Sequence, residues 1–374
     1  MNIHLINDEK FIDGFINDWE KYHQDNIYVI VSNVNHTNKI KNHKAKLIFL
    51  KPNNKSLDEF VSSLNKCDNL FIHCLSGKKQ KLFEKIKLRL NPKSYWIFYG
   101  AEMYSFLQYK GINEVLDYKN FSFKKTISRL KILLYPIYSL FRFGKLEKFK
   151  DVKYYSNLVD VFCFWNDKDY ELAKRYLNPK LKFNFFVYLV IDLSHVESYY
   201  NSFDNNLKVL VNNSASKYGN HLTILKKMNS VTKKNVEVLL PLSYDDKSHK
   251  KHILSKINSY TNLKFDLITS YMDLNSYYKK ISACRIAIFG AKRQHAAGNI
   301  FFMICIGAKV FLRNENSVKI FLENIGCYVY DYDKISSLSD FYELSEEEKN
   351  NNKNKLLTEI QSWEQRAYKN FFNT

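Results

Sequence analysis

Residues suited to binding a phosphate stand together in one polar stretch of the chain. The stretch FGAKRQHAAGN, residues 289–299, follows the apolar run ACRIAI and leads into a second apolar run, IFFMICIG. The second run predicts a buried helix, and small residues at its start, including Gly298, let a ligand approach backbone N–H groups that attract anions. Arg293 can add a bidentate contact to a pyrophosphate. An ordinary strand-to-helix turn with an exposed arginine is the alternative interpretation.

A second polar loop has the same character. It follows the apolar run at 208–211 and contains Asn213 and Ser214, with Asn220 or His221 near the start of the next helix. Such side chains hydrogen-bond phosphate groups and sugar hydroxyl groups, but they also cap helices, and the capping interpretation stays open. Because the carboxyl ends of parallel strands meet at one edge of a sheet, we expect the two loops to lie at the same edge.

Both loops must be positioned by a regular alternation of strands and helices. Short runs rich in Ile, Val, Phe and Tyr alternate with helix-like segments through the first half of the chain, and the alternation restarts near residue 208. The pattern predicts an α/β protein with two Rossmann-like, doubly wound domains, each a parallel sheet covered by helices. We place the first domain at 1–203, the second at 204–343, and a C-terminal helix at 344–374 that crosses back to the first domain.

That architecture is shared by several classes of protein. Two doubly wound domains hold a ligand in the cleft between them, at the carboxyl ends of the strands. Glycosyltransferases of the GT-B type, some epimerases and periplasmic binding proteins are all built in this way. The fold alone therefore does not select a function.

Composition and charge limit the functional classes to which the chain can belong. The chain has 374 residues, of which 45% are hydrophobic, enough to build the cores of two globular domains. Its 57 Lys and Arg residues exceed the 38 Asp and Glu residues, and the formal charge of +19 favours an anionic partner. A nucleic-acid-binding protein would explain this charge, but no helix-turn-helix, RNP-like strand or zinc-binding spacing is visible. A solvated lysine-rich surface without a function is the other interpretation.

The cysteines and the first ten residues of the chain indicate the cellular compartment of the protein. The six cysteines are scattered and form no C-x-x-C pair, so they indicate reduced core residues rather than a zinc site or a disulfide framework. The opening MNIHLINDEK has neither the basic patch nor the apolar stretch of a signal peptide. No apolar run has the length that a spanning helix needs. We expect a cytoplasmic protein whose contact with a membrane is peripheral.

One segment combines clustered positive charge with an apolar stripe. Residues 119–150 contain a single acid, Glu147, and apolar residues recur there at spacings of three and four. This pattern predicts a basic amphipathic helix, bent at Pro136, that binds anionic lipid or a polyprenyl diphosphate. A helix packed on the first domain, with its basic face in solvent, is the alternative. The basic residues expected to contact lipid are Lys124, Lys125, Arg129, Lys131, Arg142 and Lys145.

Four stretches in the second half of the chain resemble a known family in their order and spacing. They are VLVNNSASKYGNH, LLPLSY, FGAKRQHAAGN and FLRNENS, and the likeness extends into the first half through LFIHCL, YWIFYGAEMYSFL and LLYPIYSLFRF. The chain resembles the TDP-N-acetylfucosamine:lipid II N-acetylfucosaminyltransferases, the 4-alpha-L-fucosyltransferase-like enzymes of glycosyltransferase family 56. These bacterial enzymes transfer 4-acetamido-4,6-dideoxygalactose from a dTDP-sugar to a polyprenyl-linked oligosaccharide during enterobacterial common antigen assembly.

The resemblance implies a GT-B glycosyltransferase whose second domain binds the dTDP-sugar and whose first domain binds the lipid-linked acceptor. Glu315 matches a strand-end acid of the family, and it would accept hydrogen bonds from the ribose or the sugar. A charged helix cap is the alternative, because a helix begins at Ser317. The chain departs from the family at His295 and Ala296. The expected donor-binding residues are Asn213, Ser214, Asn220, His221, Arg293, Gln294, Gly298, Asn299, Glu315 and Asn316.

Glycosyl transfer needs a base for the acceptor hydroxyl and positive charge for the leaving diphosphate. Arg293 and the helix start supply that charge. The candidate bases are Glu102, which follows a strand in YGAEMY and matches an Asp of the family, and His73 in FIHCL. An exposed glutamate and a satisfied core histidine are the alternatives. No D-x-D motif follows a strand, so we expect a metal-independent mechanism with no metal site and no cofactor.

The sequence therefore predicts transfer of an N-acetylfucosamine-like deoxyamino sugar from a dTDP-sugar to an undecaprenyl-diphosphate-linked oligosaccharide. The product would belong to a cell-surface polysaccharide of the enterobacterial common antigen or O-antigen type. We expect a peripheral protein at the cytoplasmic face of the bacterial inner membrane. The alternatives are a GT-B transferase of another nucleotide sugar, such as a fucosyltransferase, and a non-catalytic protein that binds sugar or nucleic acid.

Overall fold

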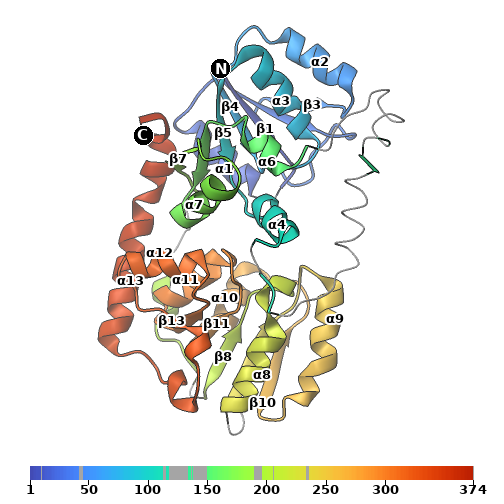
Figure 1. Ribbon diagram of the computed structural model, residues 1–374. Helices are drawn as coiled ribbons and strands as arrows, with labels where there is room; N and C mark the ends of the chain where they lie inside the picture. The colour runs from blue at the N-terminus through green and yellow to red at the C-terminus, as the bar shows by residue number, and fades with distance from the viewer. Residues whose placement is uncertain are drawn as a thin grey trace. The chain divides into compact units, whose positions relative to one another are not determined.

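The chain folds into two compact units. The first takes in the described residues up to 112, those between 134 and 188, and 363–373, while the second takes in 115–117 and 196–362. Figure 1 shows their elements coloured along the chain. The computed structural model describes residues 1–9, 11–41, 45–112, 115–117, 134–135, 137, 150–188, 196–204, 206–232 and 236–373.

A parallel sheet of seven strands forms the centre of the first unit, in the order β3-β2-β1-β4-β5-β6-β7. Helices flank the sheet (Figure 1). The strands are β1 (Asn2–Ile6), β2 (Asn26–Val31), β3 (Leu47–Leu50), β4 (Asn69–His73), β5 (Lys93–Ile97), β6 (Val161–Phe164) and β7 (Lys182–Phe185). The helices are α1 (Ile12–Glu20), α2 (Asn54–Ser63), α3 (Lys79–Leu90), α4 (Ala101–Lys110), α6 (Val152–Ser156) and α7 (Asp167–Tyr176), with a π-helical turn at Gln365–Lys369 and a short 3-10 turn at Phe371–Asn373.

A parallel sheet of six strands forms the centre of the second unit, in the order β10-β9-β8-β11-β12-β13. The strands are β8 (Lys208–Val211), β9 (Val236–Pro241), β10 (Leu263–Ile268), β11 (Ile286–Phe289), β12 (Lys309–Leu312) and β13 (Tyr330–Asp331). The helices are α8 (His221–Val231), α9 (Lys247–Lys256), α10 (Leu274–Ser282), α11 (Ala297–Cys305), α12 (Ser317–Asn324) and α13 (Glu346–Gln361). Short 3-10 turns lie at Val196–Tyr199, Lys217–Gly219, Ile257–Ser259, Tyr332–Lys334 and Leu338–Phe341.

The two sheets share one topology, which confirms the predicted pair of doubly wound α/β domains. In each sheet the chain begins at an inner strand, moves to one edge, and then returns to add strands on the other side. The reversal falls between β1 and β4 in the first unit and between β8 and β11 in the second. Open sheets of this type bind ligands at the carboxyl ends of the strands that flank the reversal. The topology therefore selects one edge of each sheet as the place for a site.

The structure divides the chain at positions other than those expected from the sequence. The described residues between 191 and 203 belong to the second unit, not the first. There the backbone N–H of Asn201 donates to the carbonyl oxygen of Ile306 at 3.1 Å, and the ring of Tyr199 packs 5.7 Å from that of Phe302. The packing of this stretch on α11 and on the residue after that helix places it in the second unit.

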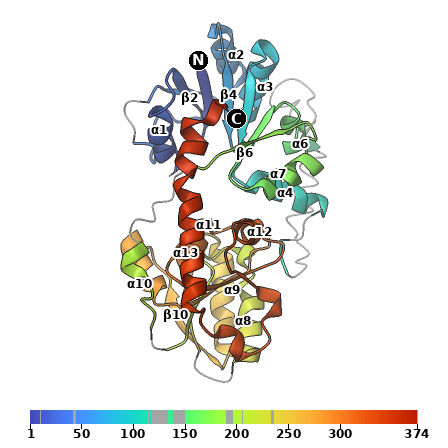
Figure 2. The same ribbon diagram turned by 90° about the vertical axis from the view of Figure 1, so that its left-hand side faces the viewer.

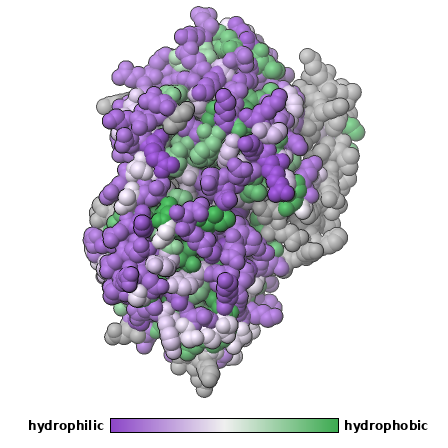
Figure 3. Space-filling model, turned by 60° about the vertical axis from the view of Figure 1, so that its left-hand side comes forward, coloured by the Kyte–Doolittle hydropathy of each residue, from purple (hydrophilic) through white to green (hydrophobic). Residues whose placement is uncertain are grey.

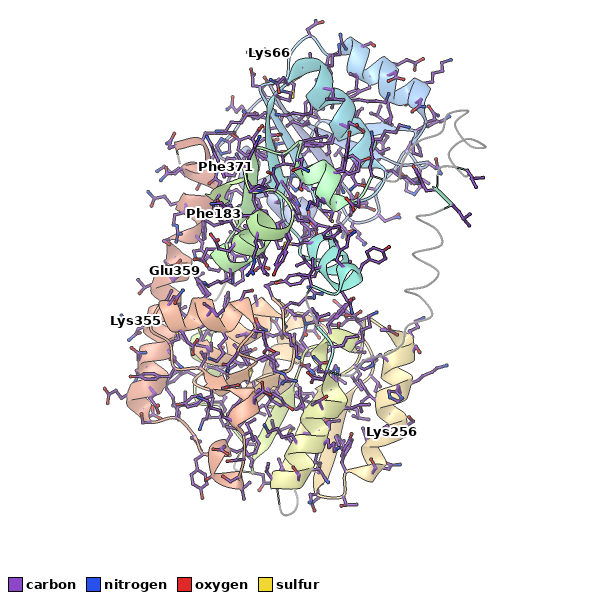
Figure 4. The ribbon with its side chains drawn as sticks, in the orientation of Figure 1. Lys66, Phe183, Lys256, Lys355, Glu359 and Phe371 are labelled. Carbon is purple, nitrogen blue, oxygen red and sulfur yellow. The ribbon has the colours of Figure 1, made fainter. Side chains whose placement is uncertain are left out.

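The C-terminal segment also divides between the units. Helix α13, on which Lys355 and Glu359 lie, packs beside α11 of the second unit (Figures 2 and 4). Residues 363–373 belong to the first unit, where the ring of Trp363 stacks on Trp165 at 5.6 Å and Phe371 is buried. The expectation that the C-terminal segment crosses back to the first domain is therefore confirmed for residues 363–373, while α13 itself belongs to the second unit.

The predicted lipid-binding segment lies almost wholly outside the described residues. Leu134 and Ile137 of its apolar stripe are described, and both are exposed. Among the described helices, none has the length and apolar character needed to cross a bilayer. The face shown in Figure 3 is mainly hydrophilic, with hydrophobic atoms in separate patches. The residues that lie outside the described part are Lys124, Lys125, Arg129, Lys131, Arg142 and Lys145.

Stacked rings fill the core of the first unit around a buried histidine pair. The ring of His4 lies 4.3 Å from that of Phe71, which stacks in turn on Tyr95 at 4.7 Å. Nδ1 of His4 and Nε2 of His73 are 3.2 Å apart, and both side chains are fully buried. Burial disfavours the charged imidazolium, so it lowers the pKa of His4 to about 3 and the pKa of His73 well below its ordinary value. Both histidines are therefore neutral at pH 7.

We expect the first unit to lose stability as the pH falls from 6.5 toward 3. In this range the unfolded chain protonates both histidines and the folded chain does not, so each fully buried histidine costs about 1.4 kcal/mol of unfolding free energy per pH unit. All four tryptophans (Trp19, Trp96, Trp165 and Trp363) lie in the first unit, so urea unfolding followed by tryptophan fluorescence reports this unit alone.

The variant His4→Phe should have a shallower dependence of unfolding free energy on pH than the wild type. The matched control is His252→Gln, because His252 is exposed and lies in the second unit. Identical slopes for wild type and His4→Phe would contradict the role given to burial of His4.

Candidate active site

Asn212 ties together the two strands that flank the reversal in the second sheet. It follows β8 in a left-handed backbone conformation, with φ of 56°. Its backbone N–H donates to the carbonyl oxygen of Ile288 in β11 at 2.9 Å, and its Nδ2 donates to the carbonyl oxygen of Gly219 at 3.0 Å. Its Oδ1 accepts a hydrogen bond from the backbone N–H of Gly290 at 3.0 Å. One side chain therefore fixes the loops after both strands.

Gly290 makes this close approach possible. A Cβ added at residue 290 would overlap the carbonyl oxygen of Gly219 and would lie 2.7 Å from Cδ1 of Ile224. The loop after β11 therefore runs directly against the 3-10 turn that precedes α8. The sequence prediction that the two polar loops lie at the same edge of the sheet is confirmed.

The start of α11 is open, as a phosphate site requires. Ala296 is the N-cap residue, in a left-handed conformation with φ of 62°, and no side chain of the described residues caps this helix end. Gly298 in the first turn is exposed, and a Cβ added there would have no heavy atom within 4 Å. The first-turn N–H groups and the positive end of the helix dipole are thus accessible to an anion.

Arg293 lies beside this helix start. Its guanidinium lies 4.9 Å from the ring centre of Tyr218, and Nη1 donates to the carbonyl oxygen of Gln294 at 3.2 Å. His295, next to the helix start, adds no charge, because burial and the neighbouring Arg293 lower its pKa to about 4. Positive charge in this loop therefore comes from arginine and from the helix end, while His295 is a neutral hydrogen-bonding group.

Two expected donor-binding residues follow Asn212 directly. Asn213 donates through Nδ2 to the hydroxyl of Tyr244 at 2.8 Å, and its Oδ1 is buried with no hydrogen-bond partner among the described residues. The hydroxyl of Ser214 donates to Oδ2 of Asp245 at 3.4 Å. Tyr244 and Asp245 come from the loop after β9, so this loop joins the site. The sequence signalled this loop through the stretch LLPLSY, which ends at Tyr244, but no residue of the loop was singled out for a role.

Asn220 and His221 act inside the protein rather than at its surface. Nδ2 of Asn220 donates to the carbonyl oxygen of Gly290 at 2.9 Å, and its Oδ1 accepts from the backbone N–H of Asp117 at 3.0 Å. His221 is fully buried, 3.4 Å from Nε2 of His249, and burial lowers its pKa to about 3. Neither side chain faces solvent, so the structure assigns both to holding the loops, not to ligand contact as the sequence suggested.

The sequence left two interpretations open for Glu315 and Asn316, ligand binding and helix capping. The structure gives the two residues different surroundings. Asn316 is buried, accepts from the backbone N–H of Val318 at 2.9 Å and caps α12. Its Nδ2 donates to the carbonyl oxygen of Ala291 at 2.8 Å. Glu315 remains 54% exposed, with Lys292 at 3.8 Å. Asn316 is therefore a structural cap, and Glu315 is the member of the pair that can accept hydrogen bonds from a ligand.

Residues that the sequence did not single out complete this edge of the sheet. Asp117 forms an ion pair with Arg313 and accepts from Nζ of Lys292 at 3.2 Å. Arg313 also pairs with Asp333. Asp117 and Arg313 are 196 residues apart in the chain, so no local pattern indicates their contact. At the helix itself, Oδ1 of Asn299 accepts from the hydroxyl of Tyr277 at 2.9 Å.

In the first unit, Glu102 lies at the carboxyl edge of the sheet, in the first turn of α4. Its Oε1 accepts from Nε1 of Trp96 at 3.0 Å, from the backbone N–H of Tyr99 at 3.1 Å and from that of Leu75 at 3.4 Å. Its Oε2 is buried with no hydrogen-bond partner among the described residues. One oxygen therefore orients the carboxylate, and the other is left to accept a proton. Glu102 is not the exposed glutamate of the alternative interpretation.

His73 lies in the core and not in a site. Its ring packs 4.6 Å from that of Phe15 and shares a hydrogen bond with His4. Complete burial among these rings favours the core-histidine interpretation over a catalytic base. No group of three or more metal-ligating side chains occurs in the part of the chain that the structure describes.

Comparison with known proteins identifies the second half of the chain. The family model described as 4-alpha-L-fucosyltransferase glycosyl transferase group 56 matches residues 155–342. No curated protein matches the chain. The matched range contains the loops after β8, β9, β11 and β12, which together carry the residues of the second-unit site.

Solved structures share the fold at low sequence identity. Sucrose-phosphate synthase from Thermosynechococcus elongatus is 8% identical, with a TM-score of 0.61 over 96% of this chain and 94% of that one. The UDP-forming alpha,alpha-trehalose-phosphate synthase from Burkholderia vietnamiensis is 7% identical, with a TM-score of 0.61 over 100% and 99%. Anabaena Alr3699/HepE, solved with UDP and glucose, is 10% identical, with a TM-score of 0.53 over 96% and 95%. The predicted GT-B fold is confirmed.

We expect Gly290→Ala to destabilise the second unit by about 1–3 kcal/mol, because the added methyl group overlaps backbone that cannot retract without moving β11. Gly298→Ala is the matched control, since its Cβ enters open space and alanine is the better helix former. Urea unfolding followed by far-UV circular dichroism compares the two variants. Equal stability of Gly290→Ala and the wild type would contradict the packing described for Gly290.

Proposed function

The chain belongs to glycosyl transferase group 56, the 4-alpha-L-fucosyltransferase family, and we propose that it transfers an N-acetylfucosamine-like sugar from a dTDP-sugar to an undecaprenyl-diphosphate-linked oligosaccharide. It is a glycosyltransferase with the GT-B fold. In the proposed reaction the acceptor oxygen bonds to the anomeric carbon of the donor sugar, and the bond from that carbon to the diphosphate breaks. The hydroxyl proton passes to a base, and dTDP leaves with the bonding electrons.

The open start of α11 beside Arg293 is the observation that carries this proposal. Uncapped N–H groups, a helix dipole and a guanidinium point to an anion, and a diphosphate gains negative charge as it leaves. These groups would stabilise the charge on the leaving group in the transition state without rearranging. The stacking of Arg293 on Tyr218 supports this role, because it limits the conformations of the side chain.

Other residues of the same edge suit the nucleoside and the sugar of the donor. Glu315 is an exposed carboxylate that can only accept hydrogen bonds, which suits ribose or hexose hydroxyl groups. Oδ1 of Asn213 is a second acceptor without a partner among the described residues. The loops that hold these two groups belong to the range matched by the family. The choice of dTDP rests on the resemblance of the sequence motifs.

Glu102 is the proposed general base. Three N–H donors orient its Oε1, and the free Oε2 can receive the proton of the acceptor hydroxyl. Glu102 lies at the carboxyl edge of the first sheet, where doubly wound domains bind their ligands. This position supports a role as the base that acts on the acceptor. Arg293 then acts on the leaving group and Glu102 on the nucleophile.

We further propose that the protein works as a peripheral protein at the cytoplasmic face of the inner membrane. The support is the basic, amphipathic composition of residues 119–150 and the exposure of Leu134 and Ile137. A polysaccharide precursor on a lipid carrier would be reached from such a surface. Co-sedimentation with vesicles that contain anionic lipid tests this location.

A fucosyltransferase is the second candidate, because the family description names that activity. The same diphosphate site would serve it, because a fucose donor also carries a nucleoside diphosphate on its anomeric carbon. GDP, UDP and dTDP therefore all belong in a test of nucleotide binding.

Addition of dTDP should raise the melting temperature of the wild type more than UDP or GDP does. A ligand that binds only the folded state adds about 2.7 kcal/mol of unfolding free energy at a concentration of one hundred times its Kd. Arg293→Ala should lose most of the dTDP-dependent rise. The exposed Arg175, on α7 of the first unit, supplies the matched control Arg175→Ala, which should keep it. Stabilisation by GDP alone would contradict the proposed donor.

Glu102→Gln should lower kcat by about 10²–10⁴ while the fold is kept, because the amide oxygen still accepts the three hydrogen bonds but the side chain takes up no proton. The measurement is transfer from a dTDP-sugar to a polyprenyl-diphosphate-linked acceptor, with thermal melting to check folding. Glu171→Gln, at an exposed position of α7, is the control and should retain full activity. Full turnover by a folded Glu102→Gln would remove Glu102 as the base.

A further inference from the structure

Besides Nδ1 of His73, which lies in the core, four buried polar atoms without hydrogen-bond partners among the described residues lie at the carboxyl edge of the first sheet. They are Nζ of Lys79, the hydroxyl of Tyr99, Oε2 of Glu102 and the hydroxyl of Tyr188. Buried polar groups in proteins are almost always hydrogen-bonded, because an unmet donor or acceptor costs free energy. Several such atoms in one region therefore indicate a place built to bind a polar group from outside the protein.

Separate elements bring these residues together. Lys79 is the first residue of α3 beyond β4, Tyr99 follows β5, Glu102 lies in the first turn of α4, and Tyr188 follows β7. The backbone N–H groups of Tyr99 and Leu75 both donate to Oε1 of Glu102, which links the loops after β4 and β5. The rings of Tyr99 and Tyr188 are 4.5 Å apart. The cluster is thus a feature of the strand ends at the reversal edge and not of one loop.

Lys79 is the most unusual member of this cluster. Its side chain is only 1% exposed, and its ammonium group makes no ion pair within the described part of the chain. Burial lowers the pKa of Lys79 to about 8, while the nearby Cys74, Glu102 and Glu9 act to raise it. A buried cation without a partner destabilises a fold, and an apolar side chain of similar length would fill the same volume at less cost. A position that carries a lysine under these conditions points to a binding role.

The mixture of groups specifies the chemistry of the ligand. Lys79 only donates hydrogen bonds, ionised Glu102 only accepts them, and the two tyrosine hydroxyls do both. A molecule with several hydroxyl groups matches all four, whereas a phosphate would meet the Glu102 carboxylate with like charge. Phe11 adds an aromatic surface, with its ring 4.9 Å from that of Tyr99 and 5.3 Å from that of Tyr188. Aromatic walls with a few directed polar groups are typical of small-molecule sites.

We propose that Lys79, Tyr99 and Tyr188 form, with Glu102, a binding site for a sugar ring of the acceptor, in which Lys79 holds a sugar oxygen and so presents the reacting hydroxyl to Glu102. Calling this sugar the acceptor rests on the function proposed above. Lys79 is a positioning residue, since it acts by placing the hydroxyl and takes no part in bond formation. The four polar atoms are buried, so entry of the sugar requires the side chains around them to move.

The variant Lys79→Met tests this site in the full chain. We expect its melting temperature to rise by about 2–4 °C, because a buried unpaired charge is removed. We also expect the KM for the acceptor to rise at least about tenfold while the KM for the donor stays within about twofold of the wild type. Lys78→Met is the matched control, because Lys78 is the adjacent residue and is exposed. It should change neither constant.

The pH dependence of acceptor binding supplies a readout that a structural role would not affect. The charged and titratable groups that face Lys79 are Glu9 after β1, His73 at the end of β4, Cys74 after β4, and Glu102 in α4. His73 stays neutral in this pH range, because burial holds its pKa well below its ordinary value. In the wild type the KM for the acceptor should rise above about pH 8, as the ammonium of Lys79 loses its proton. In Lys79→Met this rise should be absent. Lys79→Gln, which keeps an N–H donor, should recover part of the acceptor affinity at pH 7, and it replaces Lys79→Met if that variant fails to fold.

A binding measurement separates failure of this proposal from failure of the proposed function. Ligand-observed NMR with methyl glycosides of glucose, galactose and N-acetylglucosamine detects sugar binding without turnover. Glycoside binding that depends on Lys79 would support the site even if no nucleotide sugar were turned over. A folded Lys79→Met or Lys79→Gln with unchanged acceptor KM and unchanged glycoside binding would overturn the proposed sugar site. Water molecules would then be the hydrogen-bond partners of the four buried polar atoms.

Discussion

The hydrogen bonds of Asn212 are the interaction on which the second-unit site depends. Its backbone and side chain reach both strands at the reversal of the sheet, and they hold Gly219 against Gly290. This contact leaves no room for a side chain at residue 290, so the loop that follows β11 has one course. That course determines where Arg293 lies and where α11 begins. The open helix end is thus a consequence of how two strand ends are joined.

The supporting residues and the exposed ones have different tasks in this arrangement. Three buried side chains make their hydrogen bonds to other residues of the protein and hold neighbouring loops in place. They are Asn220, His221 and Asn316. Glu315 is 54% exposed on these fixed loops, and Arg293 is half-buried beside the ring of Tyr218. A site for a charged nucleotide benefits from this division, because preorganised groups stabilise a developing charge without having to move.

In both sheets, polar groups without hydrogen-bond partners among the described residues lie near the carboxyl ends of the strands that flank the reversal. In the second unit these groups are a helix end and an oxygen of Asn213 that have no partner among the described residues, which suit a phosphate and a nucleoside. In the first unit they are the groups of Lys79 and Glu102 near aromatic rings, which suit a neutral molecule rich in hydroxyl groups. One topology therefore provides two chemically distinct groups of polar atoms, and the difference lies in the residues that follow the strands.

The sequence by itself determined the two doubly wound sheets and the polar loops at their strand ends, and it singled out Arg293 and Glu102 as candidates. These features depend on periodicity and on residue type next to a strand, which are local properties. Only the tertiary structure decided that His73 belongs to the core, that Asn316 is a cap while Glu315 is exposed, and that Asp117 pairs with Arg313 across 196 residues. It alone revealed Lys79, since a lysine at the start of a helix normally extends into solvent. Burial and partnership are set by residues distant in the chain, and a local pattern carries no information about them.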